Sequence, residues 1–311
     1  MQLFDLHCDT LYRAATEKEC LTDNHFHISF KKAQTIRPWI QCMAVWIPDT
    51  MRGEQAFLFV LQCAEMLEQQ LKCTGGQIRK IETGREIKKV QEASAAGIVL
   101  TVEGGAALAG KLQNIKKLRA LGVRMMTLTW NGENELGYGC LAPGKGGLKP
   151  FGRAALQEME KNGVVADLSH ASEHLFYDVA ETAKRPFVAS HSNARHICNH
   201  PRNLTDEQFC MIRDKGGVVG INFCRSFLRQ DEKAGFADIL SHIEHFLSLG
   251  GENTVCIGSD FDGTDMPDGI KGIADMEGLY TYFLRHNYRE TLLRKVFFEN
   301  AAQFCENFDK L

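Results

Sequence analysis

Short apolar segments alternate with amphipathic segments along most of the chain. The apolar segments are rich in β-branched residues and too short for buried helices, so they predict strands. Eight of them occur, at residues 3–8, 41–47, 97–102, 123–129, 164–168, 187–189, 217–222 and 255–258. Between most of them apolar residues recur with the period of a helix. The clearest predicted helices span residues 54–71, 114–121, 173–184, 206–215, 236–249 and 290–308.

This alternation indicates a parallel sheet with helices outside it, because parallel strands need long crossover connections. Eight units in 311 residues fit a closed (β/α)8 TIM barrel. A doubly wound open sheet is the alternative fold. No internal repeat or proline-rich linker divides the sequence, which predicts a single domain over residues 1–311. The glycine-rich residues 131–150, after the fourth predicted strand, are expected to form a loop over the barrel mouth.

Composition excludes several classes of function. The formal net charge is only −3, from 36 basic and 39 acidic residues that are well mixed, so neither nucleic acid nor a membrane surface is an expected partner. The first residues lack the pattern of a secretory signal, and no apolar run of about 18 residues predicts a membrane span. The eleven cysteines form no Cys-x-x-Cys motif. We therefore expect a cytoplasmic protein with reduced thiols.

Ligand-type side chains follow five of the predicted strands, at the end of the barrel where active sites lie. In strand order they are His7 and Asp9, Glu103, His170, His191 and Asp260. His7 and Asp9 alternate along the first strand, so both are predicted to face the same cavity.

Imidazole nitrogens and carboxylate oxygens are the ligands that zinc favours. Three histidines with two carboxylates exceed the needs of one ion, which predicts two zinc ions about 3.5–4 Å apart that share Glu103. His7 and Asp9 would complete one ion, and His170 and His191 the other. A hydroxide between the ions would be the nucleophile, because two cations lower the pKa of bound water.

Each of these residues has a simpler interpretation when it is taken alone. A single histidine at a strand end is more often structural, and a single carboxylate more often caps a helix. The metal centre is favoured because five such residues follow four separate strands. The other histidines fit less well: His25 and His27 lie outside the predicted strands, and His242 and His245 are predicted on a solvated helix face.

Seven segments together resemble the membrane dipeptidase (renal dipeptidase) family of zinc peptidases. They are residues 5–9 (DLHCD), 102–105 (VEGG), 127–129 (TLT), 167–170 (DLSH), 190–192 (SHS), 202–203 (RN) and 258–263 (GSDFDG). The resemblance implies a (β/α)8 barrel with two zinc ions that hydrolyses dipeptides. Some members accept a D-residue at the C-terminal position, and some cleave β-lactam rings. A homodimer would be compatible with the family.

Carried over residue by residue, the resemblance implies the same five metal ligands. It implies that Asp260 takes a proton from the attacking water and delivers it to the leaving amine. Arg202 would bind the C-terminal carboxylate of the substrate through a bidentate pair, which selects free dipeptides over longer chains.

One position departs from the family. Better-known members carry a histidine directly after Thr-Leu-Thr, where it stabilises the carbonyl oxygen of the substrate. Here that position is Trp130, followed by Asn131, and both are expected at the substrate. Each can donate a hydrogen bond but neither carries positive charge, and losing an oxyanion donor costs about 10²–10³ in rate.

Trp130 therefore keeps a second hypothesis open: an amidohydrolase that acts on another small amide, such as an N-acyl amino acid or a cyclic amide. A barrel that only binds ligands is a third hypothesis. The complete ligand set together with Asp260 argues against it, because a binding protein needs no activated hydroxide.

Overall fold

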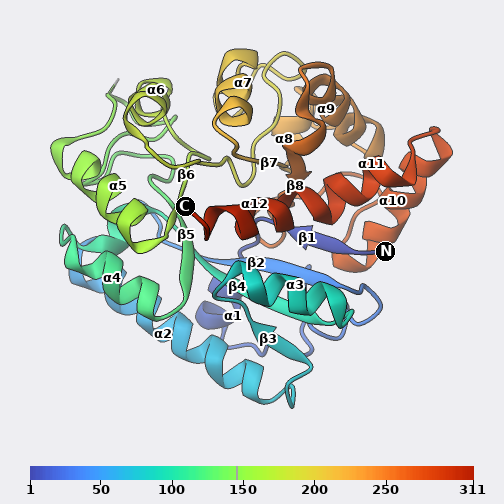
Figure 1. The fold of residues 1–311 in the computed structure, drawn as a ribbon, viewed down its shortest axis with the longest axis horizontal. Helices are drawn as coiled ribbons and strands as arrows, with labels where there is room; N and C mark the ends of the chain where they lie inside the picture. Colours follow the sequence, from blue (N-terminus) through green and yellow to red (C-terminus); the bar gives the residue numbers. More distant parts are fainter. Residues whose placement is uncertain (145) are drawn as a thin grey trace.

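The computed structural model describes residues 1–144 and 146–311, with parallel strands inside and helices around them (Figure 1). The strands are β1 (Leu3–Asp5), β2 (Trp39–Trp46), β3 (Ile78–Lys80), β4 (Ala96–Glu103), β5 (Val123–Thr127), β6 (Val165–Asp167), β7 (Val219–Ile221) and β8 (Val255–Ile257). The α-helices are α1 (Thr10–Glu17), α2 (Gly53–Lys72), α3 (Gly84–Glu92), α4 (Gln113–Ala120), α5 (Pro150–Asn162), α6 (Glu173–Thr182), α7 (Asp206–Asp214), α8 (Arg225–Leu228), α9 (Phe236–Ser248), α10 (Met276–Arg285), α11 (Glu290–Arg294) and α12 (Asn300–Phe308).

The strands close into a ring. Hydrogen-bonded neighbours follow the order β6-β5-β4-β2-β1-β8-β7. Residues 187–189 join the two ends of this order, because parallel bridges link Asp167 to Val188 and Ala189 to Val219. The predicted barrel is therefore confirmed, although its sixth strand consists of isolated bridges.

The sequence did not predict β3, which lies outside the ring. β2 pairs with β4 along its whole length and occupies one side of it. On the other side, β3 pairs with the first half of β4, where Ile78 lies opposite Ala96, and β5 pairs with the second half, where Thr127 lies opposite Glu103. The ring therefore continues through β5.

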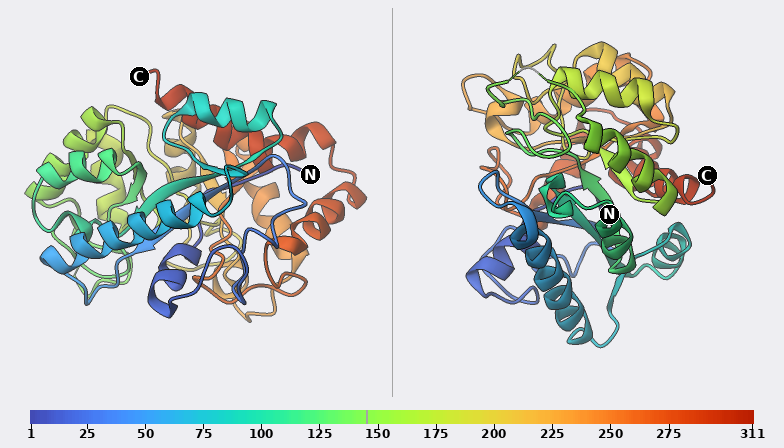
Figure 2. Two further views of the ribbon diagram at one scale, coloured as in Figure 1. Left: turned by 90° about the horizontal axis from the view of Figure 1, so that it is seen from below. Right: turned by 90° about the vertical axis from the view of Figure 1, so that its left-hand side faces the viewer.

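The last helix closes one end of the barrel. Phe4, Val99 and Met125 come from three different strands and pack in one buried apolar cluster with Phe304 and Phe308 of α12. Figure 1 shows α12 lying across the ring, and Figure 2 (left) shows α3 beside it at the same end. This is the end where the strands begin, so the opposite end, where they finish, is left for the loops that carry the candidate site.

Candidate metal centre

The predicted ligand residues converge at the C-terminal end of the barrel, and all of them are buried. His7 Nε2 lies at the centre of three carboxylates. It is 3.6 Å from Asp9 Oδ2, 3.7 Å from Glu103 Oε2 and 3.8 Å from Asp260 Oδ1. The spacing of histidine and carboxylates along the sequence thus becomes one compact cluster of nitrogen and oxygen donors.

Glu103 faces two groups of the predicted ligand residues at once. Its Oε2 atom faces His7, whereas its Oε1 atom lies 2.8 Å from His170 Nε2 and 3.4 Å from His191 Nε2. The two histidine nitrogens are themselves 3.0 Å apart. A carboxylate with one oxygen toward each group is the arrangement of a ligand shared by two metal positions.

Hydrogen bonds fix the tautomers of His170 and His191. His170 Nδ1 lies 2.8 Å from Asn131 Oδ1, an oxygen that only accepts, so Nδ1 donates. His191 Nδ1 lies 2.7 Å from Ser190 Oγ, which in turn donates to Asp167 Oδ2 at 2.6 Å. Both Nδ1 atoms therefore carry hydrogen, and both Nε2 lone pairs point toward Glu103, as in histidines that bind a metal.

These donors fit a pair of cations. Lone pairs on two imidazoles and a carboxylate repel one another at such distances unless positive charge lies among them. In the described residues, buried His7 Nε2 and Asp9 Oδ1 also have no hydrogen-bond partner, and such atoms are costly in a protein interior. A donor set of nitrogen and oxygen is the one that zinc favours.

Burial and neighbouring charges shift the pKa values of the carboxylates and histidines in this cluster. Burial raises the pKa of Glu103 well above its ordinary value and raises that of Asp260 to about 7, although His7 lowers both. Burial lowers the pKa of His170 and His191 well below the ordinary value. For His7 burial also lowers the pKa, but Glu103, Asp9 and Asp260 outweigh it and raise the value to about 10.

Sequence reasoning missed the buried residues that support this cluster. Asp5 accepts hydrogen bonds from the backbone N and Oγ of Ser259 at 2.9 and 2.5 Å, which ties β1 to the segment that carries Asp260. Asp167 accepts from Ser190 and from Thr127 Oγ1. Both aspartates stand at strand ends, two or three residues before a ligand histidine, and this spacing was a usable signal.

Asn222 was also missed, although it ends the seventh predicted strand. Its Nδ2 donates to Asp260 Oδ2 at 3.0 Å and orients that carboxylate. Asp260 itself has a φ of 61°, a conformation that is unusual for a residue with a side chain. Gly263 follows in the same turn, where a Cβ atom would overlap with the carboxylates of Asp9 and Asp260, so a larger residue would displace both of them.

A cavity of about 490 Å³ opens beside the ligands, and Trp130, Asn131 and Arg202 all line it. Trp130 packs edge-on against Trp46, with ring centroids 4.8 Å apart. Arg202 is only 4% exposed. One of its terminal nitrogens donates to the carbonyl of His191 at 3.2 Å, and its Nε has no partner among the described residues. Leu141, from the glycine-rich loop, also lines the cavity, and residue 145 of that loop lies outside the described residues.

His242 corrects the expectation of a solvated helix face, because it is fully buried. Its Nδ1 accepts from the backbone N of Ala194 at 3.1 Å, and its Nε2 donates to the carbonyl of Leu228 at 3.0 Å. Burial lowers its pKa to about 4, so it is neutral at neutral pH. Since Ala194 lies between His191 and Arg202, this histidine supports the segment that carries both.

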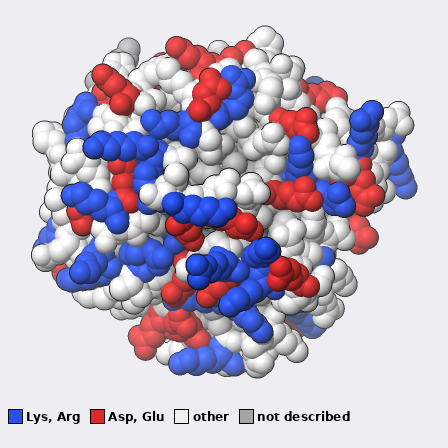
Figure 3. Space-filling view, viewed as in Figure 1, with Lys and Arg blue, Asp and Glu red and all other residues white. Residues whose placement is uncertain are grey.

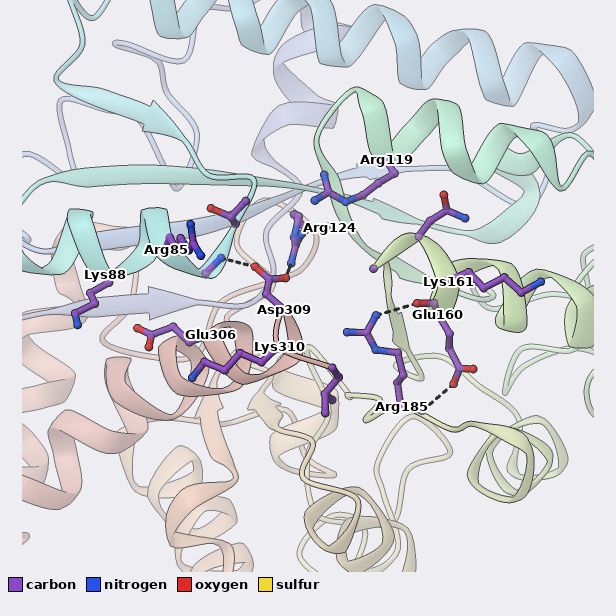
Figure 4. Close-up of a pocket in the computed structure, with 15 residues that line it drawn as sticks. Arg85, Lys88, Arg119, Arg124, Glu160, Lys161, Arg185, Glu306, Asp309 and Lys310 are labelled. Atoms are coloured by element: carbon purple, nitrogen blue, oxygen red, sulfur yellow. Dashed lines mark hydrogen bonds and ion pairs between the residues drawn. The ribbon is translucent and has the colours of Figure 1, made fainter.

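A larger hollow, of about 970 Å³, lies at the opposite end of the barrel (Figure 4). Seven basic residues line it: Arg85, Lys88, Arg119, Arg124, Lys161, Arg185 and Lys310. Figure 3 shows basic and acidic side chains interspersed over this face. Arg124 pairs with Asp309, and Arg185 donates to the carbonyls of Glu160 and Phe308. Arg124 and Arg185 therefore fasten the chain, and no group of metal donors found among the described residues lies in this hollow.

A family model described as membrane dipeptidase (peptidase family M19) matches residues 1–310. The chain belongs to this family of metallopeptidases. Solved relatives agree along the whole chain. A dipeptidase of the same family has a TM-score of 0.92 at 30% identity and covers 98% of both chains. A metallopeptidase from Rhodobacter sphaeroides, solved with a phosphinate mimic of the dipeptide L-Ala-D-Ala, has a TM-score of 0.92 at 28% identity, over 98% of this chain and 99% of its own.

A sequence relative is an uncharacterized protein in the pqqA 5′ region of Klebsiella pneumoniae. It is 32% identical over 252 residues, which is 78% of this chain and 93% of its own length. The membership supports a metal-dependent hydrolase of peptide bonds. Among the described residues, no helix combines the length and the apolar character that crossing a membrane requires.

Proposed function

We propose that the chain is a zinc dipeptidase that holds two ions, one with His7, Asp9 and Glu103 and the other with Glu103, His170 and His191. The observation that carries this proposal is the position of Glu103, whose two carboxylate oxygens face different histidines at 2.8 and 3.7 Å. A single metal position would leave one of these groups of buried donors without a cation.

Two bound zinc ions would lower the pKa of a water between them and so supply a hydroxide nucleophile at neutral pH. Asp260 would hold the proton of the attacking water and pass it to the leaving amine. Its position 3.8 Å from His7 Nε2, at the edge of the cavity, suits this role. The hydrogen bond from Asn222 to Oδ2 leaves Oδ1 as the atom that carries the proton.

Arg202 would select the substrate by its C-terminal carboxylate. A guanidinium that is 96% buried and keeps an unpartnered Nε is costly in isolation, and a carboxylate ligand would offset that cost. The small volume of the cavity also suits a dipeptide better than a longer chain. The R. sphaeroides relative binds a mimic of L-Ala-D-Ala, so dipeptides with a C-terminal D-residue belong among the candidate substrates.

Trp130 and Asn131 would line the substrate near the metal ligands. Trp130 contributes an aromatic wall together with Trp46. Asn131 would act mainly through His170, because its side-chain oxygen already accepts from His170 Nδ1. Neither side chain brings a positive charge to the developing oxyanion, so the metal ions would supply the charge there.

The test is hydrolysis of a substrate panel by protein stripped with a chelator and then titrated with zinc. The panel holds L,L-dipeptides, L,D-dipeptides and N-acyl amino acids. Dipeptide cleavage that returns at two ions per chain supports the proposal. Two bound ions with cleavage only of N-acyl amino acids would replace it with the broader amidohydrolase hypothesis, and full activity at one ion would refute the shared Glu103.

Arg202→Met tests carboxylate recognition in the same assay. Removing a charged hydrogen-bond partner costs about 1.5–3 kcal/mol, so KM should rise about 10- to 150-fold with a smaller change in kcat. Arg229→Met, at a half-exposed arginine that pairs with Asp231, is the control and should leave both constants unchanged.

A further inference from the structure

A second cluster of metal-binding side chains lies away from the barrel centre. It consists of His196, Asp206 and His245, which come from the loop after residues 187–189, from the first residue of α7 and from α9. One ligand atom from each of the three lies within 4.8 Å of the others. None of these residues belongs to the ligand set or the cavity described above.

The cluster is partly built already. His245 Nε2 lies 2.7 Å from Asp206 Oδ1, and the rings of His196 and His245 stack with centroids 4.6 Å apart and planes 6° from parallel. The side chain of His245 is only 13% exposed, whereas that of Asp206 is 46% exposed. Two donors are thus held in place, and the exposed His196 leaves the cluster open to ions from solvent.

An aromatic pair joins the two helices beside the cluster. Phe209 of α7 stacks on Phe246 of α9, the residue after His245, with centroids 4.1 Å apart and planes 5° from parallel. Both rings are fully buried, so this stack holds the two helices in register. The helices lie next to each other at the top of Figure 1.

We infer that His196, Asp206 and His245 form a peripheral zinc site. Two imidazoles and one carboxylate are a known donor set for zinc, with water free to complete a tetrahedron. Zinc ligands lie about 2.0–2.2 Å from the ion, so two donors on one ion are at most about 4.4 Å apart. The three donors lie within 4.8 Å of one another, and the exposed His196 ring would turn out of its stack on His245 to aim its nitrogen at the ion. The hydrogen bond between His245 and Asp206 explains the positions of two of the three side chains. The third donor, from His196, lies within 4.8 Å of both, and this completes a set of three ligands.

An ion at this site would have a structural role. It would tie residues 191–206, which carry both His191 and Arg202, to α9, and α9 already holds the same segment through His242. Binding to the folded state alone stabilises a protein. Zinc at this site should therefore raise the thermal midpoint without taking part in the reaction.

The test compares wild-type protein with His196→Ala. Both are loaded with excess zinc and desalted, and bound zinc per chain is counted by mass spectrometry. The wild type is expected to retain one ion more than the variant, and added zinc should raise its Tm further. Equal counts and equal shifts in Tm would overturn the inference. Because the measurement is a difference, it holds whatever number of ions the barrel centre binds.

Two further variants keep this test clear. Asp206→Asn removes a second ligand and should lose the same single ion. His174→Ala removes an exposed histidine outside the cluster and should keep the wild-type count. Equal dipeptidase activity of wild type and His196→Ala at saturating zinc separates this site from the catalytic one, so either proposal can fail without the other.

Discussion

The two ends of the barrel arrange their charged groups differently. At the end where the strands begin, charged groups face an opposite charge or the backbone: Asp309 accepts from the backbone N of Gly84 and pairs with Arg124. Arg185 donates to two carbonyls through its terminal nitrogens, and only its Nε lacks a partner among the described residues. At the end where the strands finish, His7 Nε2 and Asp9 Oδ1 are buried without a hydrogen bond.

This difference indicates which end of the barrel carries the candidate site. The larger hollow lies at the first end, and size alone would select it as the site. Pairs of opposite charge, however, hold a structure together, whereas a buried cluster of carboxylates and imidazoles that includes unpartnered atoms indicates a bound ion. In barrels of this class, residues at strand beginnings serve stability and those at strand ends serve function.

Breaking the shared ligand should have the largest effect. Glu103→Gln keeps the size of the side chain but removes the charge that faces both groups of histidines. We expect the variant to bind at least one zinc ion per chain fewer than wild type. Its kcat/KM should fall by more than about 10⁴-fold, which is the upper limit for the loss of a general base. Zinc counts and dipeptide kinetics measure this. A variant with the wild-type number of ions and near-normal activity would show that Glu103 is not a bridging ligand.

Removing the proposed proton carrier, Asp260, should lower activity less than the change at Glu103. Asp260→Asn leaves the proposed ligand set complete, so zinc content should stay unchanged while kcat falls about 10²- to 10⁴-fold. Stopped assays at saturating dipeptide give kcat directly. Asp265→Asn, at an exposed aspartate nearby, serves as the control and should behave as wild type. Unchanged hydrolysis by Asp260→Asn would end the assignment of this residue as the proton carrier.

The sequence predicted the barrel and the ligand set because both follow local rules. Apolar runs separated by amphipathic segments indicate the strands, and polar residues directly after them indicate the site. The prediction of the sixth strand was the least accurate, because residues 187–189 form only isolated bridges. β3 escaped prediction because three residues on the edge of β4 leave no periodic pattern.

Roles that depend on partners distant in the sequence could not be predicted from it. Nothing near Asn131 in the chain indicates that its oxygen accepts from His170, 39 residues away. The prediction that His242 lies on a solvated helix face was wrong for the same reason. The helical pattern placed it beside His245, but the backbone groups to which it is hydrogen-bonded belong to residues 194 and 228. Such contacts exist only after the barrel has closed.

His242 offers a way to measure how firmly the catalytic end is held. Its pKa falls from 6.5 to about 4 on folding, so its contribution to stability is complete above pH 6.5 and is lost as the pH falls toward 4. This shift corresponds to about 3 kcal/mol. We expect His242→Gln to be less stable than wild type at pH 7, with the difference shrinking below pH 6.5. Urea unfolding at pH 7.5, 6 and 4.5 measures it. A difference that does not change with pH would mean that His242 is not neutral when folded.

The smallest effect is expected at the opposite end and should appear in stability alone. Asp309→Asn weakens the pair with Arg124, whose side chain is 11% exposed, and the hydrogen bond from the backbone N of Gly84. The free energy of unfolding should fall by about 1–3 kcal/mol, because one partner of a mostly buried charged pair is removed. Lys310→Gln, the neighbouring change at an exposed site, should cost less than about 0.5 kcal/mol. Both variants should keep the wild-type kcat and zinc content. If Asp309→Asn lost activity at a temperature where it is fully folded, that result would contradict the assignment of stability to one end and of function to the other. A charge at the strand beginnings would then affect catalysis at the strand ends.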